Sequence, residues 1–257
     1  MKHFITQYKK QISAIAAILF WVAVWQFAAV YVNQSVLLVS PLVVCQTLWQ
    51  LLFTPSFWQA AAGSVVHILG GFLLALLAGV ALAVLAARFG FIKTLLSPLI
   101  LTVKSVPVAS FIILVLLWLG SAKNLAVVIS FLMVLPVLYT NTLTGILAAD
   151  KKLLEMAKLY RVPLMRRVLH IYQPAVMPHF ISGCTMALGL CWKSGVAAEV
   201  IGITDNSIGG ALYNAKIYLS TADLLAWTVV IVLISLCFEK IFMRLLLLWQ
   251  KRSAAWI

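Results

Sequence analysis

The chain has 257 residues, of which 64% are hydrophobic and 10% charged, and its mean hydropathy is +1.10. Soluble domains have about 25% charged residues and under about 50% apolar ones, so the composition excludes an ordinary soluble protein and predicts a polytopic membrane protein. The net charge of +13 alone would also suit a nucleic-acid-binding protein. The basic residues cluster beside apolar runs, however, as in the cytoplasmic loops of membrane proteins, so we expect no nucleic-acid partner.

Six apolar runs are long enough to cross a lipid bilayer, which takes about 20 mainly apolar residues. They are 12–32, 61–87, 95–119, 123–148, 174–201 and 223–248. The first could be taken for a signal peptide, but it is long and no small-residue cleavage site follows it, so we interpret it as a retained span. The segment 33–60 is too polar for a seventh span and predicts an external loop with one amphipathic helix near 41–53.

The sequence therefore predicts an all-α integral membrane protein, a six-transmembrane-helix bundle forming a single domain over 1–257 with its core at about 58–249. Its orientation follows from the positions of the Lys and Arg residues, which are enriched in cytoplasmic loops. With the N-terminus inside, the outer loops carry only Lys123 and Lys216. We therefore expect both termini to be cytoplasmic.

Residues 151–173 interrupt the apolar sequence and hold six of the nineteen Lys and Arg residues. Asp150 suits the N-cap of a helix that begins at Lys151. Because the residue before a proline disfavours helical geometry, that helix should end near Arg161, and Pro163 suits the first position of a second helix. An apolar stripe is expected along these helices, formed by Leu153, Ala157, Tyr160 and Leu164. Two short amphipathic helices, bent against each other, could lie on anionic lipid or bind a partner.

The pattern Glu155-Met156-Ala157, a bend six residues after the glutamate, and Ile171-Tyr172-Gln173-Pro174 resemble the "EAA…G…I-LP" loop of ABC importer permeases. The resemblance extends beyond the loop. Four further segments are similar to the nitrate/taurine/sulfonate branch of that family: LLVSPLVVCQTLWQLL (37–52), KSVPVASFIILVLLWLG (104–120), LPVLYTNTLTGI (135–146) and WKSGVAAEVIG (192–202).

This resemblance implies a permease subunit in the bacterial cytoplasmic (inner) membrane, forming the translocation pathway for a small solute. It implies ABC ATPase subunits, a second permease copy in a homodimer and an extracytoplasmic solute-binding protein as partners. The cytoplasmic coupling loop 149–173 would dock the ATPase. The coupling residues that follow from the match are Glu155, Ala157, Tyr160, Arg161, Pro163 and Leu164. No cofactor is expected in this chain, because ATP and Mg²⁺ would be held by the ATPase.

The chain departs from the family pattern in two places: Arg161 stands at the loop glycine and Gln173 at the leucine before the proline. An arginine in the left-handed conformation that glycine adopts there costs about 1–2 kcal/mol. Either the turn is rebuilt around Pro163, which we favour, or Arg161 accepts the strain because it contacts a partner.

Ionisable residues at membrane depth are candidates for the translocation pathway. Lys104, followed by Ser105 and Pro107, could attract an anionic solute or extend to the inner interface. Lys193 and Glu199 lie six residues apart, about 600° around a helix, and so do not face each other as a pair. Each could line the pathway or form an ion pair with another helix.

The sequence lacks the residue patterns of metal sites, of ATPases and of other enzymes. His67, His170 and His179 share no spacing, and the four cysteines form no CxxC pair, so we expect no metal site. The chain has neither a phosphate-binding GxxxxGK[ST] loop nor an assembled set of catalytic residues, so we expect no ATPase or other enzyme activity. The alternative function is a secondary transporter or channel that works without ATP. That class predicts internal repeats with matching broken helices, which the sequence does not show.

Overall fold

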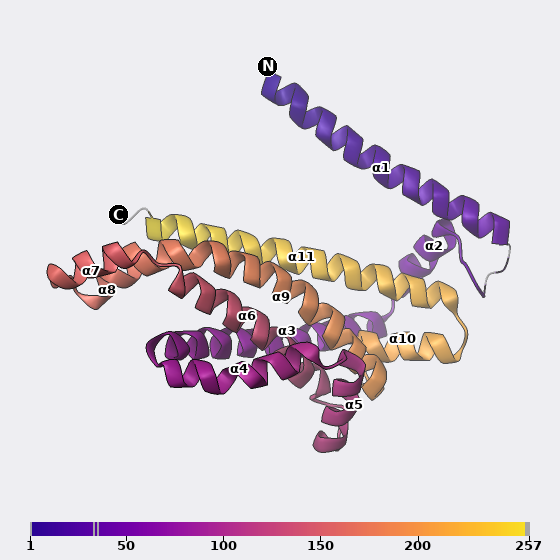
Figure 1. Ribbon diagram of the computed structural model, residues 1–257. Helices are drawn as coiled ribbons and strands as arrows, with labels where there is room; N and C mark the ends of the chain where they lie inside the picture. Colours follow the sequence, from indigo (N-terminus) through magenta and orange to yellow (C-terminus); the bar gives the residue numbers. More distant parts are fainter. Residues whose placement is uncertain (1, 33, 35, 255–257) are drawn as a thin grey trace. The chain divides into compact units, whose positions relative to one another are not determined.

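The computed structural model describes residues 2–32, 34 and 36–254, and all regular structure in these residues is helical (Figure 1). The helices form two compact units. One unit comprises Met1–Trp58 with Ala211–Val230, and the other comprises Gln59–Gly210 with Ile231–Ile257. The all-α prediction is confirmed.

The first unit contains α1 (Lys2–Val32), α2 (Pro41–Leu52), most of α10 (Ile208–Ile217) and the start of α11 (Thr221–Ala254). A cluster of buried side chains, Val39, Val44 and Ala226, joins the loop before α2, α2 and α11. Trp25 Nε1 donates a 3.1 Å hydrogen bond to the carbonyl of Val39, so α1 is also tied to this loop. The amphipathic helix expected near 41–53 is confirmed as α2.

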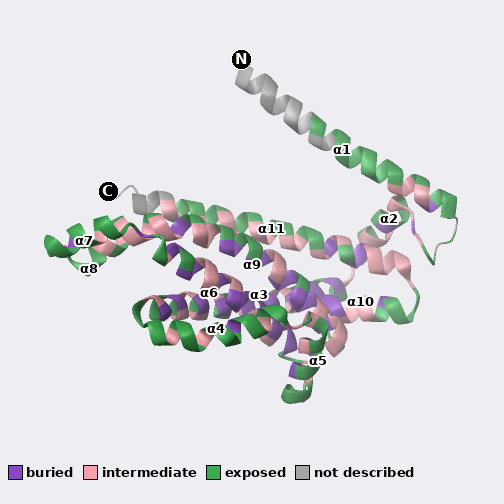
Figure 2. Ribbon diagram, in the orientation of Figure 1, coloured by how far each residue is buried: buried purple, intermediate pink, exposed green. Residues whose placement is uncertain are grey.

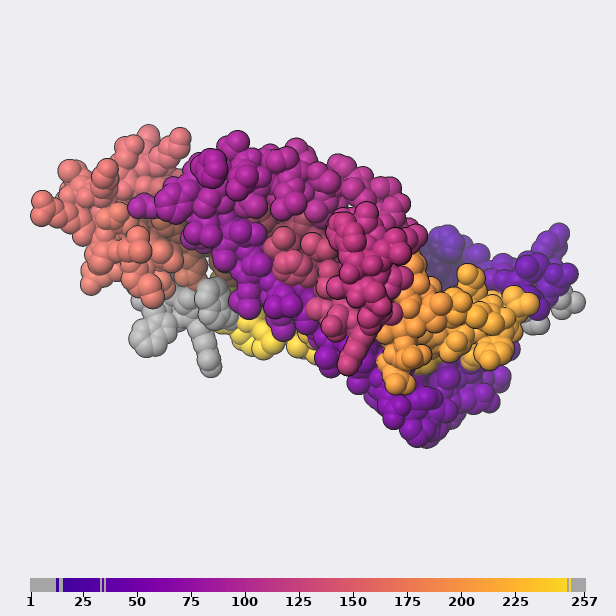
Figure 3. Space-filling model, turned by 90° about the horizontal axis from the view of Figure 1, so that it is seen from below, coloured from indigo at the N-terminus to yellow at the C-terminus, as the bar shows by residue number. Residues whose placement is uncertain are grey.

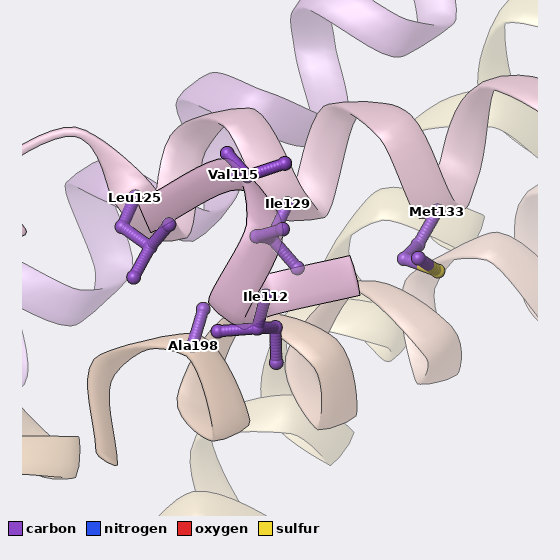
Figure 4. Close-up of a cluster of buried hydrophobic side chains, with 6 residues drawn as sticks. All are labelled: Ile112, Val115, Leu125, Ile129, Met133 and Ala198. Atoms are coloured by element: carbon purple, nitrogen blue, oxygen red, sulfur yellow. The ribbon is translucent and has the colours of Figure 1, made fainter. Parts of the chain in front are cut away.

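The second unit is built around α6 (Leu125–Leu147), which packs along α9 (Gln173–Gly202). The unit also contains most of α3 (Pro55–Arg88), α4 (Gly90–Ser105), α5 (Val108–Leu119) and the second part of α11. Figure 4 shows the apolar cluster that joins α5, α6 and α9, made of Ile112, Val115, Leu125, Ile129, Met133 and Ala198. The residues of α6 are mostly buried, as the purple segments of Figure 2 show. α6 is therefore the centre of this unit.

Small residues on α3 allow α6 to approach closely. A Cβ atom at Gly71 would collide with the backbone carbonyl of Val127, and one at Gly79 would lie 3.1 Å from Leu138 Cβ. Ala75 and Ala83, which continue the same stripe, are fully buried. Close packing through small residues is a common way for membrane helices to associate, because lipid gives no hydrophobic driving force between them.

The six predicted spans are only partly reproduced. Four helical stretches are long and apolar enough to cross a membrane: Pro55–Arg88, Leu125–Leu147, Leu164–Gly202 and Thr221–Leu248. The described apolar part of α1, Ala16–Val32, is shorter than these. A count of six is therefore not confirmed.

The predicted span over 95–119 is not one straight helix, because α4 and α5 meet at an angle of 110°. Pro107 has no backbone N–H to donate, and the preceding Val106 adopts an extended conformation (φ −74°, ψ 133°). The helix therefore ends at Ser105 and begins again at Val108.

A second boundary also differs from the prediction. The second loop helix does not end before the fifth span, since Leu164–Gly202 is one helical stretch of 39 residues. It consists of α8 (Leu164–Arg167), a π-helical turn (Val168–Tyr172) and α9. Pro174 lies in the first turn of α9 and has no N–H to donate, and the π-helical turn precedes it. The loop and the span therefore belong to one helical stretch.

Candidate functional site

The coupling loop begins with α7 (Lys151–Leu159), whose first turn is capped as predicted. Asp150 adopts an extended conformation, and its Oδ1 accepts a 2.8 Å hydrogen bond from the backbone N–H of Lys152. The carboxylate satisfies one of the helix's free donors and lies at the positive end of the helix dipole. The start of the helix is thus fixed by a local interaction.

The end of α7 overturns the favoured interpretation of its bend. Arg161 has a φ of 50°, the left-handed conformation that a glycine would supply. The N–H of Val162 donates to the carbonyl of Ala157 at 2.9 Å, and the N–H of Arg161 donates to that of Lys158 at 3.1 Å. This pair of bonds is the Schellman motif, which requires a left-handed residue after the helix. The turn is not rebuilt around Pro163; Arg161 adopts the strained geometry.

An arginine that the sequence did not single out stabilises the same bend. Arg167 Nε donates a 2.7 Å hydrogen bond to the carbonyl of Val162, the residue directly after the left-handed position. Pro163 is the N-cap of α8, one position earlier than predicted. Nothing in the spacing of Arg167 indicated this bond across the turn.

Large apolar side chains cover the outside of this bend. Ala157 alone of the predicted stripe is buried, at 6% exposure. Five large apolar side chains around the bend, two of them from the stripe, are more than half exposed. Together they are called the docking surface: Met156, Leu159, Tyr160, Leu164 and Met165. Figure 2 shows α7 and α8 mostly in green, and Figure 3 shows this segment at the edge of the second unit. Contiguous exposed apolar residues mark sites of protein or membrane interaction.

The first group of pathway candidates meets at the break between α4 and α5. Lys104 and Ser105 end α4, Pro107 precedes α5, and Lys104 and Ser105 are both exposed. Lys104 Nζ donates to the Thr140 hydroxyl of α6 over 3.4 Å, a long hydrogen bond. The end of α4 therefore places a cation beside a hydroxyl group of α6.

Lys193 and Glu199 differ from each other in their surroundings. Lys193 is exposed on α9, whereas Glu199 is fully buried. The partners of Glu199 are a hydroxyl and an amide and not a basic side chain. Ser64 of α3 donates to Glu199 Oε2 at 2.6 Å, and the N–H of Gly209 donates to the same oxygen at 3.0 Å. The two residues indeed do not form a pair.

Ser64, Glu199 and Ser207 together satisfy the first turn of α10. The N–H of Ile208 donates to Ser64 Oγ at 2.8 Å, and that of Gly210 donates to Ser207 Oγ at 2.9 Å. With the bond from Gly209 to Glu199, the first amides of the helix all have acceptors. A carboxylate at a helix N-terminus also interacts favourably with the helix dipole.

The described residues contain no cluster of three or more His, Cys, Asp or Glu side chains that could hold a metal ion. Of the cysteines, Cys184 and Cys191 are buried, whereas Cys45 and Cys237 are exposed. The chemistry that these side chains offer is therefore binding and positioning, by one exposed apolar surface, two exposed lysines and one buried hydrogen-bond network.

Comparison with known proteins places this geometry in a family. The model of the family described as "binding-protein-dependent transport system inner membrane component" matches residues 71–253. The chain belongs to this family. The resemblance to ABC importer permeases is thereby confirmed, and the permease is a multi-pass inner-membrane component of a kind that does not itself hydrolyse ATP. An ATP-independent transporter is not favoured.

Three relatives of the permease are named for the transport of sulfonates, nitrate and taurine. It is 32% identical over 203 residues to SsuC of Escherichia coli strain K12, named as an aliphatic sulfonates transport permease, with 78% of this chain and 76% of the relative covered. It is 24% identical to the nitrate import permease NrtB of Leptolyngbya laminosa, with 75% and 71% covered. It is 23% identical to the taurine transport system permease TauC of Escherichia coli strain K12, with 78% and 71% covered.

A solved structure shows the same fold. The crystal structure of an amino acid ABC transporter with histidines matches with a TM-score of 0.59 at 19% identity, covering 80% of the permease and 97% of that chain. At this identity the match supports the arrangement of the helices alone.

Proposed function

We propose that the permease forms the translocation pathway of an ATP-driven importer and that the docking surface binds its ATPase subunit. The observation that carries this proposal is the exposure of the docking surface. Leu159 is 78% exposed and Tyr160 and Leu164 are each 74% exposed, although the backbone around them is fully organised. A folded motif that presents large apolar side chains is built to bury them against another protein.

Each predicted coupling residue has a role in this proposal. Ala157 is buried and its carbonyl accepts the N–H of Val162, while Arg161 and Pro163 lie in the bend. Tyr160 and Leu164 supply contact area on either side of the bend. Glu155 is exposed and available to a polar group of the ATPase. ATP and Mg²⁺ are held by the ATPase.

The coupling mechanism is a shift between two populations. ATP binding closes the ATPase subunits, the docking surface moves with them, and the helix that begins at Leu164 carries the movement into the membrane. Moving an equilibrium from mostly inward-open to mostly outward-open takes about 5.5 kcal/mol of preference for one state. The helical stretch Leu164–Gly202 provides the connection for this movement.

The remaining partners follow from the family and from the distribution of charge. Both termini lie in the cytoplasm, and the segments 33–60 and 203–222 face an external solute-binding protein. A second copy of the permease completes the pathway. The solute is a small anion, which is supported by the exposed positions of Lys104 and Lys193 and by the sulfonate and nitrate relatives.

Co-purification tests the docking proposal. Leu159→Asp places a charge in the docking surface, and we expect it to reduce recovery of the ATPase with the permease by at least about tenfold, since a buried unpaired charge costs several kcal/mol. Leu219→Asp is the matched control, because Leu219 is 70% exposed but lies after α10. If Leu159→Asp leaves recovery of the ATPase unchanged and the permease binds anionic vesicles instead, the docking surface contacts lipid.

A further inference from the structure

Glu199 lies in a membrane-embedded helix but has no contact with solvent. It is 0% exposed, and Ser64, its hydrogen-bond partner on α3, is also 0% exposed. Its second oxygen, Oε1, has no hydrogen-bond partner among the described residues. The carboxylate therefore depends on Ser64 and on the N–H of Gly209 alone. Buried carboxylates with so few partners are costly, so one that is kept in place has a specific role to explain.

The segment that connects α9 to α10 is held in a strained conformation. Ile203 and Asn206 have φ values of 52° and 49°, and Ile203 is β-branched, which makes the left-handed conformation especially unfavourable. The N–H of Thr204 donates to the carbonyl of Glu199 at 3.0 Å, which closes the end of α9. Strained backbone persists only where the surrounding structure determines it, and such positions gather at switching elements.

The segment between α9 and α10 and the first turn of α10 lie very close to the neighbouring helices. A Cβ at Gly63 would collide with the carbonyl of Asn206, and a Cβ at Gly209 would collide with Glu199. The first turn of α10 thus rests directly on α9, and the connecting loop rests on α3. Ser64, Glu199 and the turn Ile208–Gly210 are together called the corner latch.

The corner latch and the docking surface belong to one helical stretch. Leu164, in the docking surface, begins the stretch, and Glu199 is in its last turn. At a rise of about 1.5 Å per residue, the 39 residues extend about 58 Å. A displacement at one end of a packed helix reaches the other end because interiors are close-packed and shift between discrete arrangements.

We propose that Ser64 and Glu199 are positioning residues that force the first turn of α10 to follow α9, so that a nucleotide-driven movement of the docking surface reaches residues 203–210. This inference rests on the proposed function, since it needs an ATPase that moves the loop. Without the corner latch, α9 would still move, but the amides of Ile208 and Gly209 would lose their acceptors and the turn would no longer be held. ATP hydrolysis would continue while residues 203–210 stopped responding to it.

The test uses the full-length permease with its ATPase subunit in lipid nanodiscs. Cys45 and Cys237, which are exposed, are replaced by serine, and Asp205→Cys provides a single exposed thiol beside the corner latch. The rate of maleimide labelling is measured without nucleotide and after trapping with ATP and vanadate. We expect these two rates to differ by about threefold or more, because the two states are distinct arrangements.

Ser64→Ala and Glu199→Ala should abolish this difference while ATP hydrolysis stays within about twofold of its normal rate. Glu199→Gln should preserve the difference, because an amide oxygen can accept both hydrogen bonds. Ser194→Ala is the matched control: Ser194 is a buried serine of the same helix whose hydroxyl bonds only to carbonyls of that helix. It should also preserve the difference.

The proposal is overturned if labelling of Asp205→Cys does not depend on nucleotide, or if the dependence survives both alanine variants. Parallel loss of ATP hydrolysis and of the labelling difference in both variants would also overturn it, because this indicates general misfolding. If Glu199→Ala does not assemble with the ATPase, Ser64→Ala decides the outcome. If the unmodified permease does not bind the ATPase at all, the proposed function fails first, and this result is distinct from the others.

Discussion

The hydroxyl of Ser64 donates a 2.6 Å hydrogen bond to the carboxylate of Glu199, joining two helices across 135 residues of sequence. Both side chains are fully buried, and each also accepts an N–H from the first turn of α10. The pair therefore caps a third helix while it holds the first two together. Glu199, a candidate for the translocation pathway from the sequence, is therefore enclosed in a hydrogen-bond network that positions the backbone of α10.

Gly209→Ala should destabilise the permease, because the added Cβ would collide with Glu199. We expect a loss of about 1–3 kcal/mol, as for other overpacked sites, seen as a lower midpoint of thermal unfolding in detergent. Gly70→Ala is the matched control, since a Cβ at Gly70 in α3 meets no atom within 4 Å. It should leave stability unchanged or raise it by about 0.5–1 kcal/mol. Equal effects of the two variants would contradict the packing at the corner latch.

Arg161→Val should weaken the bend of the coupling loop, whereas Arg161→Gly should not. A β-branched residue is strongly disfavoured at the φ of 50° found there, and glycine adopts it freely. We expect the amide of Val162, which is bonded to the carbonyl of Ala157, to exchange its hydrogen about tenfold faster in the valine variant than in the glycine variant. Hydrogen exchange with mass spectrometry measures this. Similar rates in both variants would show that the left-handed turn is not maintained.

The same pair of variants separates geometry from contact. If Arg161 only sets the bend, Arg161→Gly should bind the ATPase as well as the unmodified permease does. If its guanidinium contacts the ATPase, Arg161→Gly should weaken binding although the bend is intact, and this weakening should diminish as salt is raised. The guanidinium makes no hydrogen bond within the described residues, so it is free for either outcome.

Arg167→Met should loosen the junction between α7 and α8. It removes the 2.7 Å hydrogen bond from Arg167 Nε to the carbonyl of Val162 but keeps most of the apolar volume. We expect a cost of about 1–2 kcal/mol, detected as faster proteolysis within the loop. Arg166→Met is the control, because Arg166 is an exposed arginine of the same helix. If the two variants resist the protease equally, the hydrogen bond from Arg167 to Val162 does not stabilise the bend.

Lys104→Met should reduce uptake of a small sulfonate or nitrate if the break between α4 and α5 lines the pathway. The lysine is exposed there beside the Thr140 hydroxyl, and a cation in a confined site raises the local concentration of anions. We expect about a tenfold fall in uptake by proteoliposomes, with Lys104→Arg retaining most of it. Lys93→Met, in the same helix but at its other end, should have no effect. Unchanged uptake in Lys104→Met would remove this residue from the pathway.

The sequence-based prediction differs from the structure in where helices break and where they continue. The 110° angle at Pro107 depends on how α5 packs against α6 and α9. The second loop helix and the span from residue 174 were predicted as separate elements, but the π-helical turn before Pro174 continues the helix. A proline changes local bonding in a predictable way, whereas the direction of the chain after it is decided by packing.

The sequence by itself determined the features that depend on neighbouring residues or on the membrane. It determined the apolar stretches, the helix near 41–53, the capping of α7 by Asp150 and the position of the bend at Arg161, because caps, turns and apolar runs involve residues a few positions apart. Only the tertiary structure decided that Glu199 binds Ser64 and Gly209. Hydrogen bonds across long separations have no periodic signature, so they appear only when the helices are packed.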